Sequence, residues 1–453
     1  MPPRKLVLVV IDGLTAAAFE RAAESPRTPA LACLASHGDY RRAVSVFPSL
    51  TPVCVTSLAT GAYPDVHRIP HLVWYDRDAR RLIEYGSSFP AMVAAGTRRS
   101  IIDTIFNMNA RHLGQSAVTI FEALEDAGLV TAAVNFTCYR GRNAHRTTLP
   151  GVSRVARGPR RFFFYSLFES DDTGAPLAVR RRAAGSIDDY ATFVGRWLVT
   201  RDGFDFFVYY LCDYDYLSHA LGPDGAEEGL VRVDRAVAAL FDAAGGADAF
   251  LERYAVLLCS DHGQTAVREP VQLEHAFGDL RIRRRRGPAA ADVVVAASNR
   301  AGMVYRLRGC KDDVRALAAR LDGDPSVDVA LFLEGGEAIA RRDGEELRFA
   351  ADGGEWRTSG DRSILSHPNA LERVWHALNN PRAGELLVSA AEGYEFADLG
   401  GRHHAGGGSH GSLVAGDSEV PMLSVAAGPP PASIVGVAPA ALAHFGVPLA
   451  RAA

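Results

Sequence analysis

The chain contains very little lysine and no long hydrophobic run. Lys5 and Lys311 are the only lysines among 49 basic residues, and the formal net charge is −4 at pH 7. This balance does not favour a nucleic-acid-binding protein, which usually carries an excess of positive charge. No segment approaches the roughly 20 apolar residues that a membrane-spanning helix requires. We therefore expect a protein that binds neither nucleic acid nor a membrane.

Cysteine is also scarce. The six cysteines include no CxxC pair and follow no regular spacing, so we expect buried, reduced thiols, as in cytosolic proteins. Residues 1–13 begin with basic residues, but their apolar part is too short for a signal peptide and predicts a β-strand. The predicted location is therefore cytoplasmic. The sequence does not indicate an oligomeric state.

What the chain does contain is a regular alternation of buried strands and amphipathic helices. With 453 residues, of which 48% are hydrophobic, it can form more than one domain-sized unit. Helices are predicted at 116–127, after a Ser N-cap and before Gly128, and at 227–244, before Gly245. The alternation indicates an α/β fold with a mainly parallel sheet between helices. The predicted strands are residues 5–11, 130–136, 206–211 and 255–259.

The regular alternation of strands and helices is interrupted between residues 266 and 399. We interpret this segment as an inserted α+β cap, with residues 1–265 and 400–453 forming the catalytic core. Within the cap we expect strands at 293–297, 303–307 and 327–333, a helix near 312–321, and a charged, turn-rich stretch after 333. The basic run from Arg281 to Arg286 is interpreted as a solvated loop, with an electrostatic funnel for anionic substrates as the alternative.

Several polar residues follow the predicted strands directly. Asp12 comes after the first strand, and the adjacent Asp261 and His262 come after the strand at 255–259. Asp215 and His219 have a D-x3-H spacing that places both on one side of a helical turn, suited to a single ion. Because active sites of α/β proteins lie at the carboxyl ends of parallel strands, these side chains are expected to meet.

Two of the candidate metal-ligand positions could be filled by more than one residue. Asp213 is a second choice beside Asp215, since its spacing to His219 is poorer. His410 lies in a glycine- and serine-rich loop, and the neighbouring His403 and His404 could replace it or contact substrate.

Thr51 precedes Pro52, and Gly61 follows about three turns later. This pattern predicts a helix with Thr51 as its N-cap, which would present free N–H groups to an anion. Metal coordination would lower the pKa of the Thr51 hydroxyl and make it a nucleophile.

Carboxylates mixed with imidazoles suit zinc, with manganese or iron as alternatives. Two such ions about 4 Å apart can hold both the attacking and the leaving oxygen during displacement at phosphorus. The candidate ligand set is Asp12, Thr51, Asp215, His219, Asp261, His262 and His410.

The chain resembles the alkaline phosphatase superfamily, and within it the type I phosphodiesterase and nucleotide pyrophosphatase family. The similar motifs are VVIDG, FPSLTPVCVTSLATGAYPDVHRI, DYDYLSHALGP, LLCSDHG and GGSHG, which cover about residues 5–265 and 400–425. The resemblance implies an alkaline phosphatase-like core and a small phosphorylated substrate. It also implies that Asp215, His219 and His410 hold one zinc, and that Asp12, Asp261 and His262 hold the other, with Thr51 bonded to it.

The chain departs from the family pattern where substrate phosphate is held. The position of a family Asn that donates to phosphate is Leu72, and the residue after the nucleophile is Pro52, which has no N–H. Losing one such donor can cost roughly 3 kcal/mol of transition-state stabilisation. The N–H groups of Val53 and Cys54, or the side chain of His71, could compensate.

The favoured function is hydrolysis of a phosphate diester or pyrophosphate through a covalent phosphothreonine. A phosphomonoesterase or phosphonate hydrolase is the alternative within the same fold. A phosphomutase is disfavoured, because mutases of this superfamily generally use serine and manganese. A non-catalytic ligand-binding homologue is disfavoured by the complete ligand set.

Overall fold

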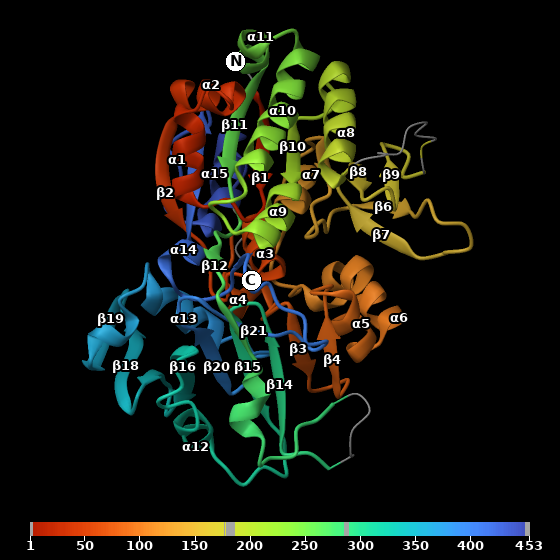
Figure 1. Ribbon diagram of the computed structural model, residues 1–453. Helices are drawn as coiled ribbons and strands as arrows, with labels where there is room; N and C mark the ends of the chain where they lie inside the picture. Colours follow the sequence, from red (N-terminus) through yellow and green to blue (C-terminus); the bar gives the residue numbers. More distant parts are fainter. Residues whose placement is uncertain (1–2, 176, 178–185, 285–289, 449–453) are drawn as a thin grey trace.

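The computed structural model describes residues 3–175, 177, 186–284 and 290–448 (Figure 1). Its centre is an eight-stranded sheet. The five middle strands run parallel, and β23 and β9 run antiparallel to their neighbours. The order is β2 (Asp39–Val44), β23 (Glu419–Val425), β11 (Tyr254–Cys259), β1 (Lys5–Ile11), β10 (Phe206–Leu211), β5 (Thr131–Val134), β8 (Arg161–Phe164) and β9 (Phe168–Ser170).

Helices cover both faces of this sheet. Alternate residues of β1 point to opposite sides, so Leu8 packs in one apolar layer and Val9 in the other. The continuous apolar run of β1 is therefore explained by burial on both faces. One layer contains α3 (Thr51–Thr60), α7 (Ile120–Asp126) and α15 (Val437–His444). The other contains α1 (Ala16–Glu24), α2 (Pro29–His37), α8 (Ile187–Arg201), α10 (Glu227–Ala244) and α11 (Ala247–Arg253).

A second, seven-stranded antiparallel sheet forms the lower half of Figure 1. Helix α12 (Val314–Ala319) packs on one of its faces, and α13 (Ala370–Leu378) packs with the other. Its order is β14 (Val293–Ser298), β15 (Ala301–Arg306), β20 (Leu386–Ala390), β16 (Val327–Glu334), β17 (Glu337–Arg342), β18 (Glu345–Asp352) and β19 (Glu355–Gly360).

Part of the N-terminal chain lies beside this second sheet. The hairpin of β3 (Val73–Asp76) and β4 (Arg81–Glu84) contacts β14, and α5 (Phe89–Ala95) and α6 (Thr97–Ile102) lie in the same half of the molecule (Figure 1). The domain boundaries expected at 265/266 and 399/400 stay a prediction.

The structure corrects three local predictions. The helix expected at 116–127 begins only at Ile120, because Thr119 and Glu122 form a capping box there. The charged stretch after 333 forms β17, β18 and β19 instead of irregular turns, because Leu347 and Phe349 alternate with polar residues and bury one face of β18. Opposite charges also pair across the strands, as between Arg341 and Glu346 at 3.0 Å. Helix α3 begins at Thr51, with Leu50 as its N-cap.

The other strands and the helix at 227–244 lie within a few residues of their predicted positions. Helix α10 ends before Gly245, whose φ of 97° is a left-handed conformation that glycine adopts easily. The remaining described elements are α4 (Pro64–His67), α9 (Asp213–Leu221), α14 (Ala415–Ser418), the π-helical segment Asp103–His112, 3-10 segments Leu273–Phe277, Arg362–Leu365 and Ile434–Gly436, and strands β6 (Asn143–Arg146), β7 (Val155–Gly158), β12 (Thr265–Ala266), β13 (Glu269–Val271), β21 (Tyr394–Phe396) and β22 (Gly408–Ser409).

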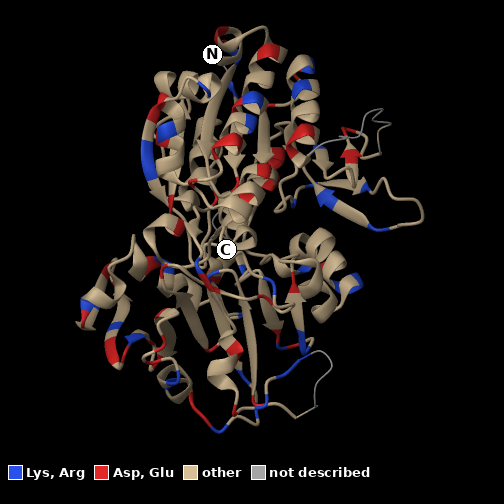
Figure 2. Ribbon diagram, in the orientation of Figure 1, with Lys and Arg blue, Asp and Glu red and all other residues tan. Residues whose placement is uncertain are grey.

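Charged residues of both signs are distributed over both halves of the molecule (Figure 2). Within the predicted solvated loop, Arg281 pairs with Asp292 at 2.8 Å and Arg284 contacts Glu274. Arg285 and Arg286 lie outside the described residues.

All six cysteines are unpaired, and four are buried. None of the helices in the described part of the chain has the length and apolar character needed to cross a bilayer.

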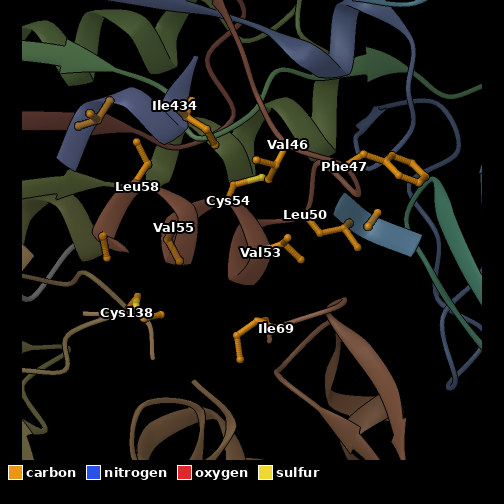
Figure 3. Close-up of a cluster of buried hydrophobic side chains, with 14 of the residues drawn as sticks. Val46, Phe47, Leu50, Val53, Cys54, Val55, Leu58, Ile69, Cys138 and Ile434 are labelled. Atoms are coloured by element: carbon orange, nitrogen blue, oxygen red, sulfur yellow. The ribbon is translucent and has the colours of Figure 1, made fainter. Parts of the chain in front are cut away.

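Helix α3 is buried along its length. Its residues from Pro52 to Thr60 are all buried, and Figure 3 shows Val53, Cys54 and Leu58 within the apolar cluster that surrounds it. A helix enclosed in this way has little freedom to shift, since core packing is dense. The position of Thr51 at its N-terminal end is therefore well defined.

Candidate active site

Three adjacent strands of the central sheet end at one place. Asp12 follows β1, Asp261 and His262 follow β11, and β10 leads into α9, which carries Asp215 and His219. The three strands are parallel neighbours, so their carboxyl ends lie at the same sheet edge. All five side chains belong to residues that are buried or nearly so.

Four polar atoms converge at the first cluster. His262 Nε2 lies 3.3 Å from Asp12 Oδ1, 3.6 Å from Asp261 Oδ2 and 3.0 Å from Thr51 Oγ1. Thr51 does not act as the N-cap, because the carbonyl of Leu50 accepts the first amide hydrogen bonds of α3. The Thr51 hydroxyl is therefore left to face His262.

The second cluster lies beside the first. His219 Nε2 is 3.3 Å from Asp215 Oδ2, as their spacing on α9 favours. The His410 ring stacks on the His262 ring with centroids 3.6 Å apart, and it lies 5.2 Å from the His219 ring. Potential ligand atoms of Asp215, His262 and His410 lie within 4.8 Å of one another. The grouping of His219 with Asp215 and His410 around one ion stays a prediction.

The three histidines share one hydrogen-bonding pattern. Each directs Nδ1 at a backbone carbonyl, which fixes the tautomer with the proton on Nδ1 and leaves the Nε2 lone pair free. A free Nε2 lone pair is what a metal ion requires of a histidine ligand. The acceptors are Gly408 O at 2.7 Å for His219, Gly263 O at 3.0 Å for His262 and Ser49 O at 2.8 Å for His410.

The electrostatics of the site require positive charge. Burial raises the pKa of Asp12, and the nearby Asp261 and Asp215 carboxylates raise it further. Burial opposes protonation of His262, but the Asp261 and Asp12 carboxylates outweigh it and raise the pKa of His262 to about 10, so Nε2 holds either a proton or a metal ion at neutral pH. Burial, together with the charge of His262, lowers the pKa of His410. Buried carboxylates of this kind need a proton or a metal ion nearby.

Two carboxylate oxygens without hydrogen-bond partners in the described part of the chain indicate that a metal ion supplies the positive charge. Asp12 Oδ1 and Asp261 Oδ2 are buried and accept no hydrogen bond from the described residues. A buried acceptor without a partner is costly unless something else occupies it. The oxygen and imidazole donors present here match the ligands that zinc prefers. The residues therefore fit a divalent metal centre.

The clusters open into a cavity of about 800 Å³. Its wall is largely apolar and aromatic and includes Met108, Phe164 and Tyr165. Among the described residues, no lysine or arginine lines it. Apart from four tyrosines and Cys212, the polar and charged lining residues are Asp12, Thr51, Ser87, Thr104, Thr137, Asp215, His219, Asn299, His403, His404 and His410.

Neither the N–H groups of Val53 and Cys54 nor the side chain of His71 is free to hold phosphate in place of the family donors. The N–H groups of Val53 and Cys54 both donate to Leu50 O, at 2.9 and 3.0 Å, so the expectation that they hold phosphate is wrong. Helix geometry is the reason, because amides in the first turn reach back to the N-cap carbonyl. His71 is fully buried, does not line the cavity, and accepts from the Val73 N–H at 3.1 Å. Leu72 does line it.

The competing residues also have defined positions. Asp213 accepts a hydrogen bond from the Asp188 N–H at 3.3 Å and does not line the cavity. His404 lines the cavity, stacks on His219 with centroids 4.0 Å apart, and directs Nδ1 at Glu395 Oε1 at 2.7 Å. His403 is exposed at the cavity rim.

Sequence patterns missed Asn299. This residue comes from the turn between β14 and β15 in the second sheet, yet its Nδ2 lies 3.2 Å from His410 Nε2. No motif or spacing in the sequence connects residue 299 with residue 410. The proximity depends on how the two sheets pack together.

Comparison with known proteins agrees with this geometry. The type I phosphodiesterase / nucleotide pyrophosphatase family matches residues 6–413. No curated protein matches the chain.

Solved structures of similar fold cover nearly the whole chain. An inactive variant of murine ectonucleotide pyrophosphatase / phosphodiesterase 5 in complex with AMP has a TM-score of 0.61 and 13% identity, covering 99% of this chain and 96% of its own. The human protein of that name has a TM-score of 0.62 and 14% identity, with coverage of 98% and 96%. Phosphonoacetate hydrolase from Sinorhizobium meliloti 1021 has a TM-score of 0.62 and 20% identity, with coverage of 98% and 96%.

The mainly parallel sheet between helices, with ligand-type side chains at its carboxyl edge, defines an alkaline phosphatase-like protein. The chain belongs to the type I phosphodiesterase / nucleotide pyrophosphatase family. Members of this family are phosphoester hydrolases that typically depend on two metal ions.

Proposed function

We propose that the protein is a two-metal hydrolase that cleaves a phosphate diester or pyrophosphate bond through a covalent phosphothreonine at Thr51. One observation carries the proposal. The Thr51 hydroxyl faces the cavity 3.0 Å from His262 Nε2, within a set of carboxylates and imidazoles suited to divalent ions. Zinc is the proposed metal, because nitrogen ligands accompany the carboxylates.

The residues of the chain have separable roles in this reaction. The bound ions would withdraw charge from the phosphoryl oxygens and acidify the nucleophile. Thr51 Oγ1 loses its proton to solvent and forms the new bond to phosphorus while the bond to the leaving oxygen breaks, and that oxygen takes up a proton from solvent. Water then cleaves the P–O bond of the phosphothreonine, which returns the threonine hydroxyl and releases the phosphoryl product. Asp12, Asp261 and His262 would hold one ion beside Thr51, and Asp215, His219 and His410 would hold the other. The buried helix α3 keeps the hydroxyl at a fixed position in the cavity.

The cavity favours an ester with an uncharged, apolar or aromatic substituent. Its wall offers Met108, Phe164 and Tyr165 to such a group, and no described lysine or arginine to a second anion. This lining disfavours a small dianion such as the phosphonoacetate bound by the similar Sinorhizobium meliloti enzyme. Phosphonate hydrolysis is nevertheless the second candidate, because that enzyme shares the fold.

A parallel assay separates the candidates. Zinc-loaded protein is given an aryl phosphate diester, a dinucleoside pyrophosphate, the aryl phosphate monoester and phosphonoacetate, and kcat/KM is determined for each. We expect the diester to be the best substrate and the pyrophosphate, which carries a second anionic phosphate, to be the next best. Preference for the monoester or phosphonoacetate would replace the proposal with the corresponding alternative. Metal-loaded protein that turns over none of the four would support a ligand-binding role.

A further inference from the structure

Asn299 brings a carboxamide from the second sheet into the active-site cavity. Ser298 pairs with Ala301, so Asn299 and Arg300 form the two-residue turn that joins β14 to β15. Asn299 has φ of 56°, a left-handed conformation that asparagine adopts more readily than most residues. It is 7% exposed and provides the only carboxamide among the described residues that line the cavity.

The orientation of this carboxamide is fixed by its neighbours. The Ser298 hydroxyl donates to Asn299 Oδ1 at 2.9 Å, and Nδ2, on the other side of the carboxamide, carries the two N–H donors. Nδ2 then points at His410 Nε2, 3.2 Å away. The His410 ring stacks on His262, whose Nε2 is 3.0 Å from the Thr51 hydroxyl. Asn299 and Thr51 therefore flank the same pair of stacked imidazoles.

The turn is anchored so that Asn299 cannot easily move away. The Arg300 N–H donates to His410 O at 2.8 Å, and the Phe396 N–H donates to Asn299 O at 2.7 Å. The Arg300 side chain is fully buried and pairs with Asp417 at 2.9 Å. Hydrogen bonds on both sides of Asn299 thus hold it beside His410.

The site needs a phosphate donor that its sequence motifs do not supply. Pro52 has no N–H, Leu72 has no polar group, and the N–H groups of Val53 and Cys54 are used within α3. When the His410 Nε2 lone pair binds a metal ion, Asn299 Nδ2 loses its acceptor there. A buried donor without a partner is unfavourable, and a phosphoryl oxygen of the substrate would provide the missing acceptor.

We propose that Asn299 contacts the substrate, donating a hydrogen bond from Nδ2 to a non-bridging phosphoryl oxygen in place of the donor lost at Leu72. This role rests on the proposed phosphoryl-transfer function. It assigns part of the phosphate site to the second sheet, so the packing of the two sheets completes the catalytic site.

Two variants isolate the carboxamide. Asn299→Gly removes the side chain and keeps the left-handed backbone accessible, whereas Asn299→Asp keeps the shape and replaces the donor with a charged acceptor. Asn369→Gly is the matched control, because Asn369 also has a left-handed φ, of 46°, and lies outside the cavity. Zinc content, kcat/KM for the best ester, and calorimetric affinity for orthovanadate are measured for each variant and for wild type.

We expect both Asn299 variants to retain zinc and to lose about 100-fold in kcat/KM, as when an oxyanion donor is removed. Vanadate affinity should fall in parallel, more for Asn299→Asp, and Asn369→Gly should match wild type. Adding Leu72→Asn to Asn299→Gly should restore more activity than it adds to wild type, because both positions would supply the same donor.

Unchanged vanadate affinity in Asn299→Gly would overturn the proposal. Loss of zinc from that variant would also overturn it, since Asn299 would then serve to position His410. The vanadate measurement needs no turnover, so it tests Asn299 even if wild type hydrolyses none of the four assayed compounds, which would refute the proposed function separately.

Discussion

The hydroxyl oxygen of Thr51 lies 3.0 Å from Nε2 of His262, at the N-terminal end of a helix that is buried along its length. The same nitrogen faces the carboxylates of Asp12 and Asp261 at 3.3 and 3.6 Å. A hydroxyl, two carboxylates and an imidazole from three separate chain segments thus meet at one point. This arrangement places the proposed nucleophile beside the candidate metal ligands, and mutation can separate their contributions.

Thr51→Ala should abolish turnover while leaving the fold and most of the metal binding intact. The reason is that the variant removes the proposed nucleophile, whereas six other candidate ligands remain. Activity should fall by about 10³-fold or more, as when other enzymes lose their nucleophile, with near-wild-type metal content and melting temperature. Thr51→Ser should retain part of the activity, because a serine hydroxyl at the same helix position can occupy the same place. Retained turnover in Thr51→Ala would exclude a phosphothreonine intermediate.

The purified protein should contain close to two divalent ions per chain. Chelation should remove activity, and added zinc should restore it, because the buried carboxylates of Asp12, Asp215 and Asp261 need cations. Elemental analysis and a zinc titration monitored by activity measure both quantities. Substituting His262, which faces both clusters, should lower metal content more than substituting His403, which is exposed at the rim. Full activity in metal-free protein would refute the two-metal reading.

The sequence predicted the core of this site because local patterns define it. Apolar runs identify β1, β10 and β11, and parallel neighbours must bring the residues after them together. Asp12, Asp215 and Asp261 could therefore be named from their positions after strands. Which histidines belong to which ion could not be derived from spacing, since His262 faces both clusters in space.

Other features depend on contacts that local patterns do not contain. Asn299 is held in the cavity by contacts between distant segments, such as the Arg300 N–H with His410 O and the Arg300 side chain with Asp417, 117 residues away in sequence. The start of α3 differed from the prediction by one residue, because proline near a helix start permits more than one N-cap position. The strands β17 to β19 were missed because their many charged residues and glycines resemble a turn-rich loop, although Leu347 and Phe349 alternate with polar residues and are buried.

The buried ion pair of Arg300 and Asp417 should be important for stability. Both side chains are fully buried, and the Arg300 guanidinium also contacts Thr265 and the carbonyls of Ala391 and Tyr394. Removing one partner leaves the other charge buried, at a cost of about 3–5 kcal/mol. Arg300→Ala should therefore lower the free energy of unfolding by about that amount in urea titration.

The exposed Arg27 is a suitable comparison for Arg300. It pairs with Glu227 at 2.8 Å on the surface, where ion pairs contribute little. Arg27→Ala should leave the urea transition unchanged within error. Equal effects of the two variants would contradict a special role for the buried pair.

Stability should fall as the pH decreases below about 6.5, partly through His67. This side chain is fully buried; Nε2 lies 3.1 Å from the Ser57 hydroxyl, and Nδ1 accepts the Ile69 N–H at 3.2 Å. Protonation at Nδ1 would break that bond, and burial lowers the pKa of His67 to about 3. Because the unfolded chain binds this proton near pH 6.5, stability is complete above that pH and is lost as the pH falls toward 3. The slope from one such group reaches about 1.4 kcal/mol per pH unit.

His67→Asn tests this contribution. An asparagine carbonyl can accept the N–H two residues on, as Nδ1 does for Ile69, but it does not titrate. Urea unfolding of metal-free protein between pH 7.5 and 4.5 should show a shallower loss of stability in this variant, by up to about 1.4 kcal/mol per pH unit below pH 6. The same substitution at the exposed His37 should keep the wild-type slope. Parallel profiles for wild type and His67→Asn would show that the His67 imidazole is not the titrating group.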